Sequence, residues 1–175
     1  ATLYLEIFVP ALRMIGKRWE EGQINVADEH CASAVMQRLI GRSGPLFHRP
    51  GRKRGIVVLG APEGELHGIP AALAADLLRG RGFIVVDLGA DVPTESFVEC
   101  VQRLPRVMAV AVTVTTPRRA PAVRRFVAAL RAGGIVMPII VGGSGIDDAT
   151  ARRVGADAWG DDAPRLLHLL AEVIR

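Results

Sequence analysis

After residue 54 the sequence alternates between short apolar runs and longer amphipathic stretches, and this alternation constrains the fold more than any other feature. Nearly continuous apolar runs are typical of strands buried on both faces, as in parallel sheets. The amphipathic stretches between them predict crossover helices. The predicted strands are Ile56–Leu59, Phe83–Leu88, Met108–Val114, Ile139–Val141 and Ala156–Trp159, and the predicted helices are Ala71–Arg79, Thr94–Arg103, Ala120–Arg131, Asp148–Arg153 and Ala163–Ile174.

This order of elements predicts an α/β fold, a flavodoxin-like doubly wound parallel sheet of five strands in the order 2-1-3-4-5. Ligands of such sheets bind beyond the carboxyl ends of the strands, near the switch in strand order between the first and third strands. The candidate site is therefore expected on the loops that follow Leu59, Val114 and Val141.

The first part of the chain follows a different pattern. Apolar residues recur at three- and four-residue steps before residue 20 and again after residue 25, which predicts two helices. Pro10 predicts a kink or a restart of the first helix. Asn25 is the expected N-cap of the second, with Asp28 three positions on in a near capping-box arrangement. The predicted domains are an α-helical cap, a partial helical bundle, at 1–42, a basic linker at 43–54 and the sheet domain at 55–175.

Composition excludes several classes of protein. Half of the 175 residues are hydrophobic, enough for a buried core, which excludes disorder for most of the chain. No apolar run approaches the roughly 20 residues that cross a bilayer, so we expect no membrane segment. Cys31 and Cys100 are too few for a disulfide scaffold, and without a visible signal peptide we expect a cytoplasmic protein. A net charge of +4 spread along the chain is weak evidence for nucleic acid binding, and we find no DNA-binding motif in the sequence.

The loop after the first predicted strand contains a histidine, His67, flanked by Glu65 and Gly68. A histidine at this edge of the sheet can bind a metal ion if its other ring nitrogen is held, and Glu65 is placed to accept that hydrogen bond. Taken alone, the loop favours a surface histidine that precedes a helix. Its position at the ligand crevice favours the metal-binding interpretation.

The other two loops carry hydroxyls and glycines. Thr113 and Thr115 can hydrogen-bond a buried ligand atom, although threonine is also common at strand ends. Gly142, Gly143 and Ser144 either allow close backbone approach to a ligand or form a tight turn. The pattern is not G-x-G-x-x-G and lacks an acidic residue placed for a ribose, which disfavours a dinucleotide site.

Together these spacings resemble the cobalamin-binding domain, whose pattern is Asp-x-His-x-x-Gly, then Ser-x-Leu or Ser-x-Thr, then Gly-Gly. Here the pattern reads Glu65-x-His67-x-x-Pro70, Thr113-x-Thr115 and Gly142-Gly143. The resemblance implies base-off cobalamin with His67 as the lower cobalt ligand. It also implies a slot for the displaced nucleotide tail, lined by the hydroxyl and glycine residues and bordered by an alanine-rich helix. Glu65 and Pro70 depart from the family's aspartate and glycine.

The helical half resembles the Trp-x9-Glu-His motif of CarH/LitR-type light-sensing regulators, through Trp19, Glu29 and His30. That resemblance implies that these residues shield the upper group of adenosylcobalamin, with methylcobalamin as the alternative cofactor. It implies a non-enzymatic, light-responsive sensor that regulates transcription, forms a homo-oligomer and acts through an output domain or partner protein outside this chain. Glu20 stands where the best-known members carry a histidine that binds cobalt after illumination.

Three alternatives remain. A corrinoid-carrier protein of a cobalamin-dependent methyltransferase would share the module 55–175 but would not specifically predict the Trp19 motif. The cobalamin subunit of a mutase needs a substrate barrel, for which the chain has no room. A flavodoxin-like response module would need an acidic cluster after the first strand, where only Glu63 and Glu65 stand.

Overall fold

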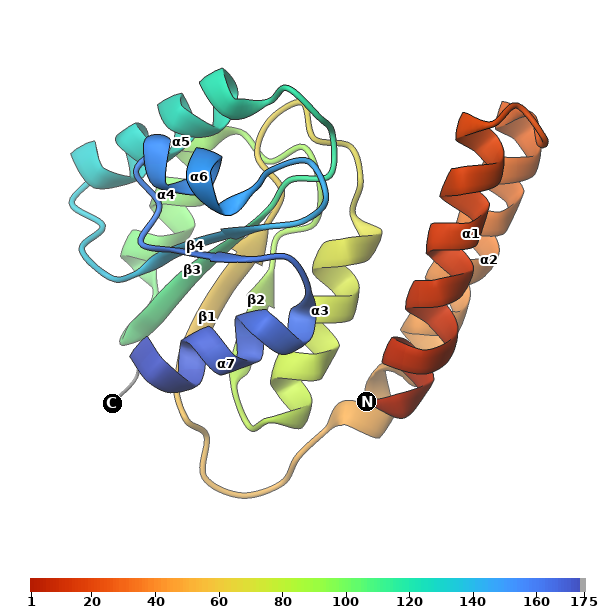
Figure 1. The fold of residues 1–175 in the computed structure, drawn as a ribbon. Coiled ribbons are helices and arrows are strands. Elements are labelled where there is room, and N and C mark those ends of the chain that lie inside the picture. Colours follow the sequence, from red (N-terminus) through yellow and green to blue (C-terminus); the bar gives the residue numbers. More distant parts are fainter. Residues whose placement is uncertain (174–175) are drawn as a thin grey trace. The chain divides into compact units, whose positions relative to one another are not determined.

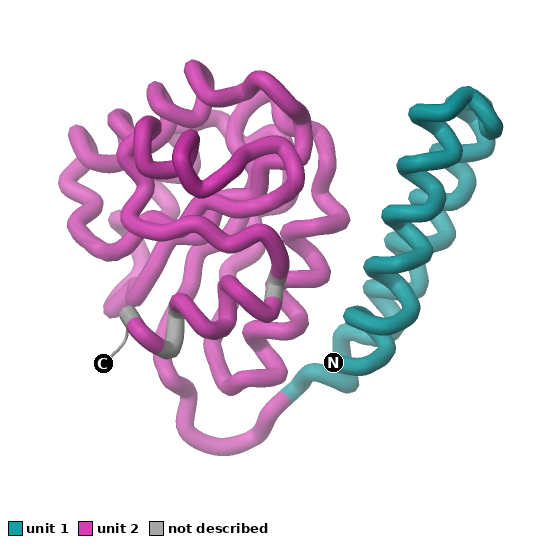
Figure 2. The backbone as a smooth tube through the Cα atoms, in the orientation of Figure 1, with its two compact units in different colours: residues 1–48 teal, residues 49–175 magenta. Residues whose placement is uncertain are grey.

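A computed structural model describes residues 1–173, apart from the side chains of residues 163, 170, 171 and 173. The chain forms two compact units, a helical unit at residues 1–48 and a sheet unit that begins at Arg49 (Figure 2). The division falls within the stretch 43–54 that the sequence predicts as a linker. Among the described residues, no helix has the length and apolar character needed to cross a membrane.

The sheet unit contains a five-stranded parallel sheet in the order β2-β1-β3-β4-β5, which confirms the predicted fold (Figure 1). Its strands are β1 (Ile56–Gly60), β2 (Ile84–Asp87), β3 (Val107–Thr113), β4 (Ile139–Gly142) and β5 (Ala158–Gly160). Its helices are α3 (Ile69–Gly80), α4 (Thr94–Arg103), α5 (Ala120–Ala132), α6 (Asp148–Arg153) and α7 (Ala163–Val173). Ile174, the predicted end of the last helix, lies outside the described residues.

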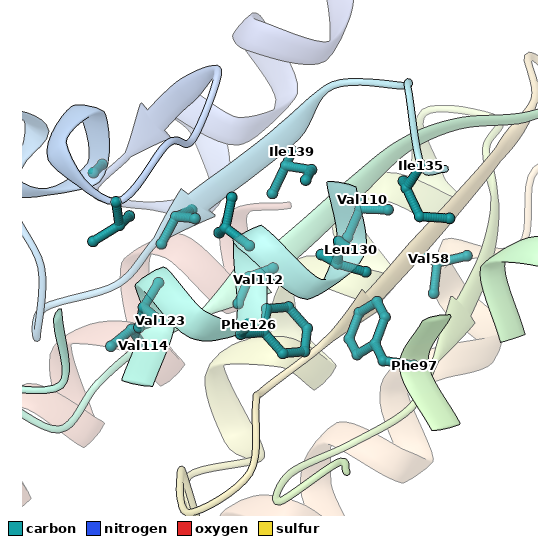
Figure 3. Close-up of a cluster of buried hydrophobic side chains, with 14 of the residues drawn as sticks. Val58, Phe97, Val110, Val112, Val114, Val123, Phe126, Leu130, Ile135 and Ile139 are labelled. Carbon is teal, nitrogen blue, oxygen red and sulfur yellow. The ribbon is translucent and has the colours of Figure 1, made fainter. Parts of the chain in front are cut away.

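Helices α3 and α7 cover one face of the sheet, and α4, α5 and α6 cover the other (Figure 1). Successive residues of β3 alternate between the two cores: Val110 and Val112 join the cluster around Phe97 and Phe126, drawn in Figure 3, whereas Ala111 faces the alanines of α3. Both faces are thus apolar, which explains the unbroken apolar runs. The two cores fix the sheet whose carboxyl edge carries the site.

The helical unit consists of η1 (Leu3–Phe8), α1 (Val9–Glu20), α2 (Val26–Ser43) and η2 (Gly44–Phe47). A π-helical turn gives way to α-helix at Val9 with Pro10 in the first turn, as the predicted restart requires. Asn25 and Asp28 form a reciprocal capping box, with both hydrogen bonds 3.1 Å long. The small core centres on Tyr4, whose ring contacts Phe47 at 4.4 Å between centroids.

Candidate functional site

The three predicted loops meet at one edge of the sheet because β1, β3 and β4 are neighbours. Gly60 at the end of β1 is paired with Val112, and Thr113 at the end of β3 is paired with Gly142. The loops that follow therefore start side by side. This edge brings together all the site residues predicted for the sheet unit.

Glu65 makes hydrogen bonds to two of the loops at the carboxyl edge of the sheet. Its side chain is completely buried, with 0% of its surface exposed. One carboxylate oxygen accepts from the backbone amides of Thr115 at 2.8 Å and Thr116 at 2.7 Å. The other accepts from the Thr116 hydroxyl at 3.1 Å and from the His67 amide at 3.2 Å. Glu65 thus ties the loop after β1 to the loop after β3.

These hydrogen bonds determine the charge of Glu65. Burial on its own would raise the pKa of the carboxyl, but the hydrogen bonds from the Thr116 amide, from the ring and amide of His67 and from the Thr115 amide outweigh it. The pKa therefore lies below its usual value. At neutral pH Glu65 is a carboxylate, which only accepts hydrogen bonds.

The charge of Glu65 fixes the tautomer of His67. Nδ1 of His67 lies 2.5 Å from a Glu65 oxygen, so Nδ1 carries the hydrogen and donates it. In the neutral ring, Nε2 then keeps a free lone pair, as a histidine bound to a metal ion requires. The His67 side chain is 58% exposed, so the ring is accessible from outside. The predicted pairing of Glu65 with His67 is therefore present in the structure.

Two hydroxyls at the end of β3 are buried without a partner. Among the described residues, the Oγ1 atoms of Thr113 and Thr115 are the buried side-chain nitrogen or oxygen atoms that make no hydrogen bond. A buried hydroxyl without a hydrogen bond costs free energy, and such atoms are rare in folded proteins. Both lie at the edge where the ligand was expected, so an arriving ligand could satisfy them.

The glycines of the third loop are required by the protein itself. A Cβ on Gly142 would lie 2.1 Å from the Gly160 carbonyl oxygen, and one on Gly143, whose φ is +112°, would lie 2.4 Å from the Val114 oxygen. The close approach of β5 therefore accounts for Gly142, and the turn with positive φ accounts for Gly143. Ser144 is exposed. Gly68 is the N-cap of α3, and a Cβ built on it would meet Ala90 only at ordinary van der Waals distance. Contacts of these residues with a ligand stay a prediction.

The alanine-rich start of α3 packs closely on the sheet. Ala71, Ala74 and Ala75 are buried in one cluster with Ala109 and Ala111 of β3. The predicted slot for a nucleotide tail beside these alanines stays a prediction.

The remaining predicted residues belong to the helical unit. Trp19, in the last turn of α1, is 48% exposed, and Glu29 and His30 lie in the first turns of α2. Glu29 accepts from Ser33 at 2.6 Å and lies 2.9 Å from Nδ1 of His30. Their predicted role over the upper face of a cofactor stays a prediction.

Three contributors to the site were not predicted from the sequence. Thr116 donates twice to Glu65, Asp91 accepts from the Gly64 amide at 2.7 Å, and Arg119 donates to the Glu63 carbonyl at 2.7 Å. Thr116 directly follows the threonine pattern, so its position gave a signal. Asp91 and Arg119 lie 27 and 56 residues from their partners, and no local pattern marks them.

Comparison with known proteins identifies this architecture. Residues 55–167 match the family model for the B12 binding domain, and residues 1–42 match a second model of the same description. The chain belongs to the B12-binding domain family. Its cofactor is cobalamin. Among the described residues no cluster of three or more His, Cys, Asp or Glu side chains could hold a bare metal ion.

Relatives of this B12-binding chain include named corrinoid proteins. It is 29% identical to the trimethylamine corrinoid protein of Methanosarcina barkeri over 89% of this chain and 74% of the relative. A cobalamin-binding protein from Desulfitobacterium hafniense is 25% identical with a TM-score of 0.66, covering 93% of this chain and 77% of that one. The monomethylamine corrinoid protein of Methanosarcina barkeri, 21% identical, shares the fold with a TM-score of 0.81 over 93% and 78% of the two chains.

The residues at the carboxyl edge fit cobalamin. His67 offers one free ring nitrogen whose opposite nitrogen is held by a buried carboxylate. Thr113 and Thr115 offer buried hydroxyls that lack partners. A single nitrogen ligand and nearby unsatisfied polar atoms suit a cofactor that brings its own equatorial ligands and a polar tail.

Proposed function

We propose that this B12-binding protein is a corrinoid methyl carrier, which receives a methyl group from one partner enzyme and delivers it to another. Two observations support the proposal. One relative is named trimethylamine corrinoid protein, a name that links a corrinoid to a methylated amine. The Nδ1 atom of His67 is held by Glu65, which leaves Nε2 free to bind a metal ion. When bound, cobalamin supplies a cobalt ion that accepts and releases the methyl group. The chain itself is then not the enzyme for either transfer, and we expect it in the cytoplasm with its partners.

The observation that carries the proposal is the Glu65–His67 pair. The Glu65 carboxylate holds the hydrogen on Nδ1, so Nε2 would be the atom that holds the cobalt ion of the cofactor. Because Glu65 is fixed by Thr115 and Thr116, the imidazole is a rigid and electron-rich ligand. A ligand of this kind would hold the cofactor in place and would set the electron density at its cobalt ion.

The other residues would retain the cofactor. Thr113 and Thr115 would hydrogen-bond polar atoms of the nucleotide tail, since both hydroxyls are buried without partners. Gly142 and Gly143 keep the third loop close to the ends of β3 and β5. Gly68 and Ser144 are expected to contact the cofactor from the loops on either side.

Light sensing is the second candidate, and the Trp19, Glu29 and His30 motif favours it. In that case these residues would shield an adenosyl group, and its loss in light would change the oligomeric state. The two candidates share the lower half of the site and differ in what happens on the upper face of the cofactor. We place the carrier first because the relatives include a protein named trimethylamine corrinoid protein.

One experiment separates the two functions. The protein is loaded with hydroxocobalamin, reduced to the cob(I)alamin state and mixed with extract of the source organism and trimethylamine, dimethylamine or methanol. A methyl carrier converts to the methylcobalamin spectrum with one of these donors. A second sample, loaded with adenosylcobalamin, keeps the same size-exclusion profile in darkness and green light. Failure to accept methyl groups, together with a light-driven change of oligomeric state, would move the assignment to light sensing.

A further inference from the structure

The carboxyl edge contains residues that break local rules of backbone and helix structure. In the described chain three residues other than glycine have positive φ, namely Asp91 at 55°, Arg118 at 61° and Arg106 at 55°. Such residues are uncommon, and their strain is often kept at functional sites. Asp91 and Arg118 lie in the loops after β2 and β3, at the same edge of the sheet as His67.

Arg119, next to Arg118, breaks a second rule. It occupies the N-cap of α5, where small polar side chains are preferred and where the helix dipole opposes a positive charge. The first turn of α5 contains no acidic side chain to offset this charge. The position of Arg119 therefore needs an explanation outside its own helix.

Asp91 and Arg119, the two unusual residues, both contact the same short segment, Glu63–Glu65. Asp91 accepts from the Gly64 amide at 2.7 Å and donates its own amide to the Glu65 carbonyl at 2.9 Å. Arg119 donates to the Glu63 carbonyl at 2.7 Å. Its guanidinium lies against Gly64 so closely that a Cβ there would be 2.1 Å from Nη2. The segment is thus held from the two neighbouring loops at once.

We propose that Asp91 and Arg119 are positioning residues that preset the Glu63–Glu65 segment, and through it the orientation of the His67 ring. The inference rests on the proposed role of His67 as lower ligand. The ring is more than half exposed, so its own packing does little to orient it. Its orientation depends on Glu65 and on the backbone of the loop, which Asp91 and Arg119 clamp. Supporting residues of this kind set how well a ligand side chain meets its metal.

The test uses variants that separate the contact from the backbone strain. Glycine and asparagine both tolerate positive φ, but only asparagine keeps an oxygen that can accept from Gly64. Asp91→Gly therefore removes the contact without adding strain, and Asp91→Asn is its matched rescue. Arg119→Ala removes the hydrogen bond to the Glu63 carbonyl, together with a positive charge that opposes the helix dipole. Arg119→Lys keeps the charge and an N–H group that can donate to the same carbonyl. Arg124→Ala, an exposed arginine on α5, is the neutral control.

Each variant is produced with 15N-labelled histidine, loaded with hydroxocobalamin and reduced to the cob(II)alamin state. Histidine ligation is measured by the 15N coupling in the EPR spectrum, which differs from the 14N coupling of the cofactor's own base. We expect Asp91→Gly and Arg119→Ala to lower the ratio of histidine-ligated to unligated cobalt on the order of tenfold. Asp91→Asn and Arg119→Lys should recover most of this ratio, and Arg124→Ala should match the unmodified chain. Unchanged ratios in both Asp91→Gly and Arg119→Ala would overturn the inference.

A measurement without cofactor checks the cause. Hydrogen exchange of the Gly64 amide should accelerate in Asp91→Gly and stay slow in Asp91→Asn, with circular dichroism showing that both variants are folded. Equal exchange in the two variants would contradict the clamp. If the unmodified chain itself shows no coupling from 15N-labelled histidine, or if His67→Ala keeps that 15N coupling, the ligand assignment fails instead, so the two failures are distinguishable.

Discussion

Among the described residues there are three Glu–His pairs: Glu65–His67 in the sheet unit, Glu29–His30 in the helical unit, and the exposed pair Glu172–His168 on α7. The first two each join near neighbours in sequence, yet they differ in distance, burial and hydrogen-bond partners. The nitrogen–oxygen distance is 2.5 Å in Glu65–His67 and 2.9 Å in Glu29–His30. The Glu65 side chain is 0% exposed and accepts from backbone amides of two loops, whereas Glu29 is 30% exposed on a helix surface. The contrast shows that burial and backbone donors, rather than the residue types, fix the position of the glutamate and with it the tautomer of its histidine.

The largest expected difference concerns the two glutamates. Glu65→Ala leaves the amides of Thr115 and Thr116 buried without an acceptor, so it should destabilise the sheet unit by about 3 kcal/mol. Glu29→Ala should change the stability of the helical unit by less than about 0.5 kcal/mol. Urea unfolding followed by Trp159 fluorescence, in a Trp19→Phe background, reports the sheet unit. Trp19 fluorescence, in a Trp159→Phe background, reports the helical unit. Equal effects of the two substitutions would remove the basis of the comparison.

Glycine substitutions should have opposite signs in the two units. Gly143→Ala places a Cβ 2.4 Å from the Val114 oxygen at a φ of +112°, which should cost about 2 kcal/mol. Gly16 lies in α1 with nothing within 4 Å of a built Cβ. Gly16→Ala should therefore stabilise the helical unit by about 0.5–1 kcal/mol. Thermal unfolding of both variants checks this. A stabilised Gly143→Ala protein would show that the third loop is less constrained than described.

A threonine substitution separates binding from stability. Thr113→Val keeps the side-chain shape and removes a buried hydroxyl that has no partner, so the cofactor-free protein should be unchanged or up to about 1 kcal/mol more stable. Cobalamin affinity should fall about five- to tenfold, because the ligand loses one hydrogen bond. Titration with hydroxocobalamin measures this fall. If affinity is retained, the hydroxyl does not face the cofactor.

The smallest expected effects concern the helical unit. Trp19 and Met14 are both about half exposed on α1, at 48% and 53%. Trp19→Ala should barely change stability or corrin affinity, but it should speed loss of an upper adenosyl group, whereas Met14→Ala should not. Spectra of the adenosylcobalamin complex over time give the comparison. If Trp19→Ala leaves the adenosyl group equally stable, the cap assignment is wrong.

Much of the sheet unit could be predicted from the sequence because its signals are local. The apolar run at 108–114 predicts a strand without reference to the rest of the chain. The spacing of apolar residues in the segments before and after it predicts helices. Given five strand–helix units, few strand orders are available, and the predicted order is the observed one. The capping box at Asn25 and Asp28 is equally local and was also predicted.

The contacts that hold the site residues in place could be predicted from the sequence only in part. The spacing of Glu65 and His67 indicated their pairing, since a two-residue step is visible in the sequence. The clamp by Asp91 and Arg119 was not visible, because its contacts join loops far apart in the chain and use backbone atoms, which leave no residue pattern. The reason for Gly142 and Gly143 likewise became clear only from the neighbouring carbonyl oxygens.

The central claim, that the buried pair rather than the exposed pair binds cobalt, is tested most directly by labelling histidine with 15N. The labelled chain is loaded with cobalamin, and the EPR spectrum of the cob(II)alamin state is recorded with the His67→Ala and His30→Ala variants. We expect a nitrogen coupling that changes with the label, persists in His30→Ala and disappears in His67→Ala. A coupling in the unmodified chain that is unaffected by the label, or a 15N coupling that survives in His67→Ala, would contradict the account.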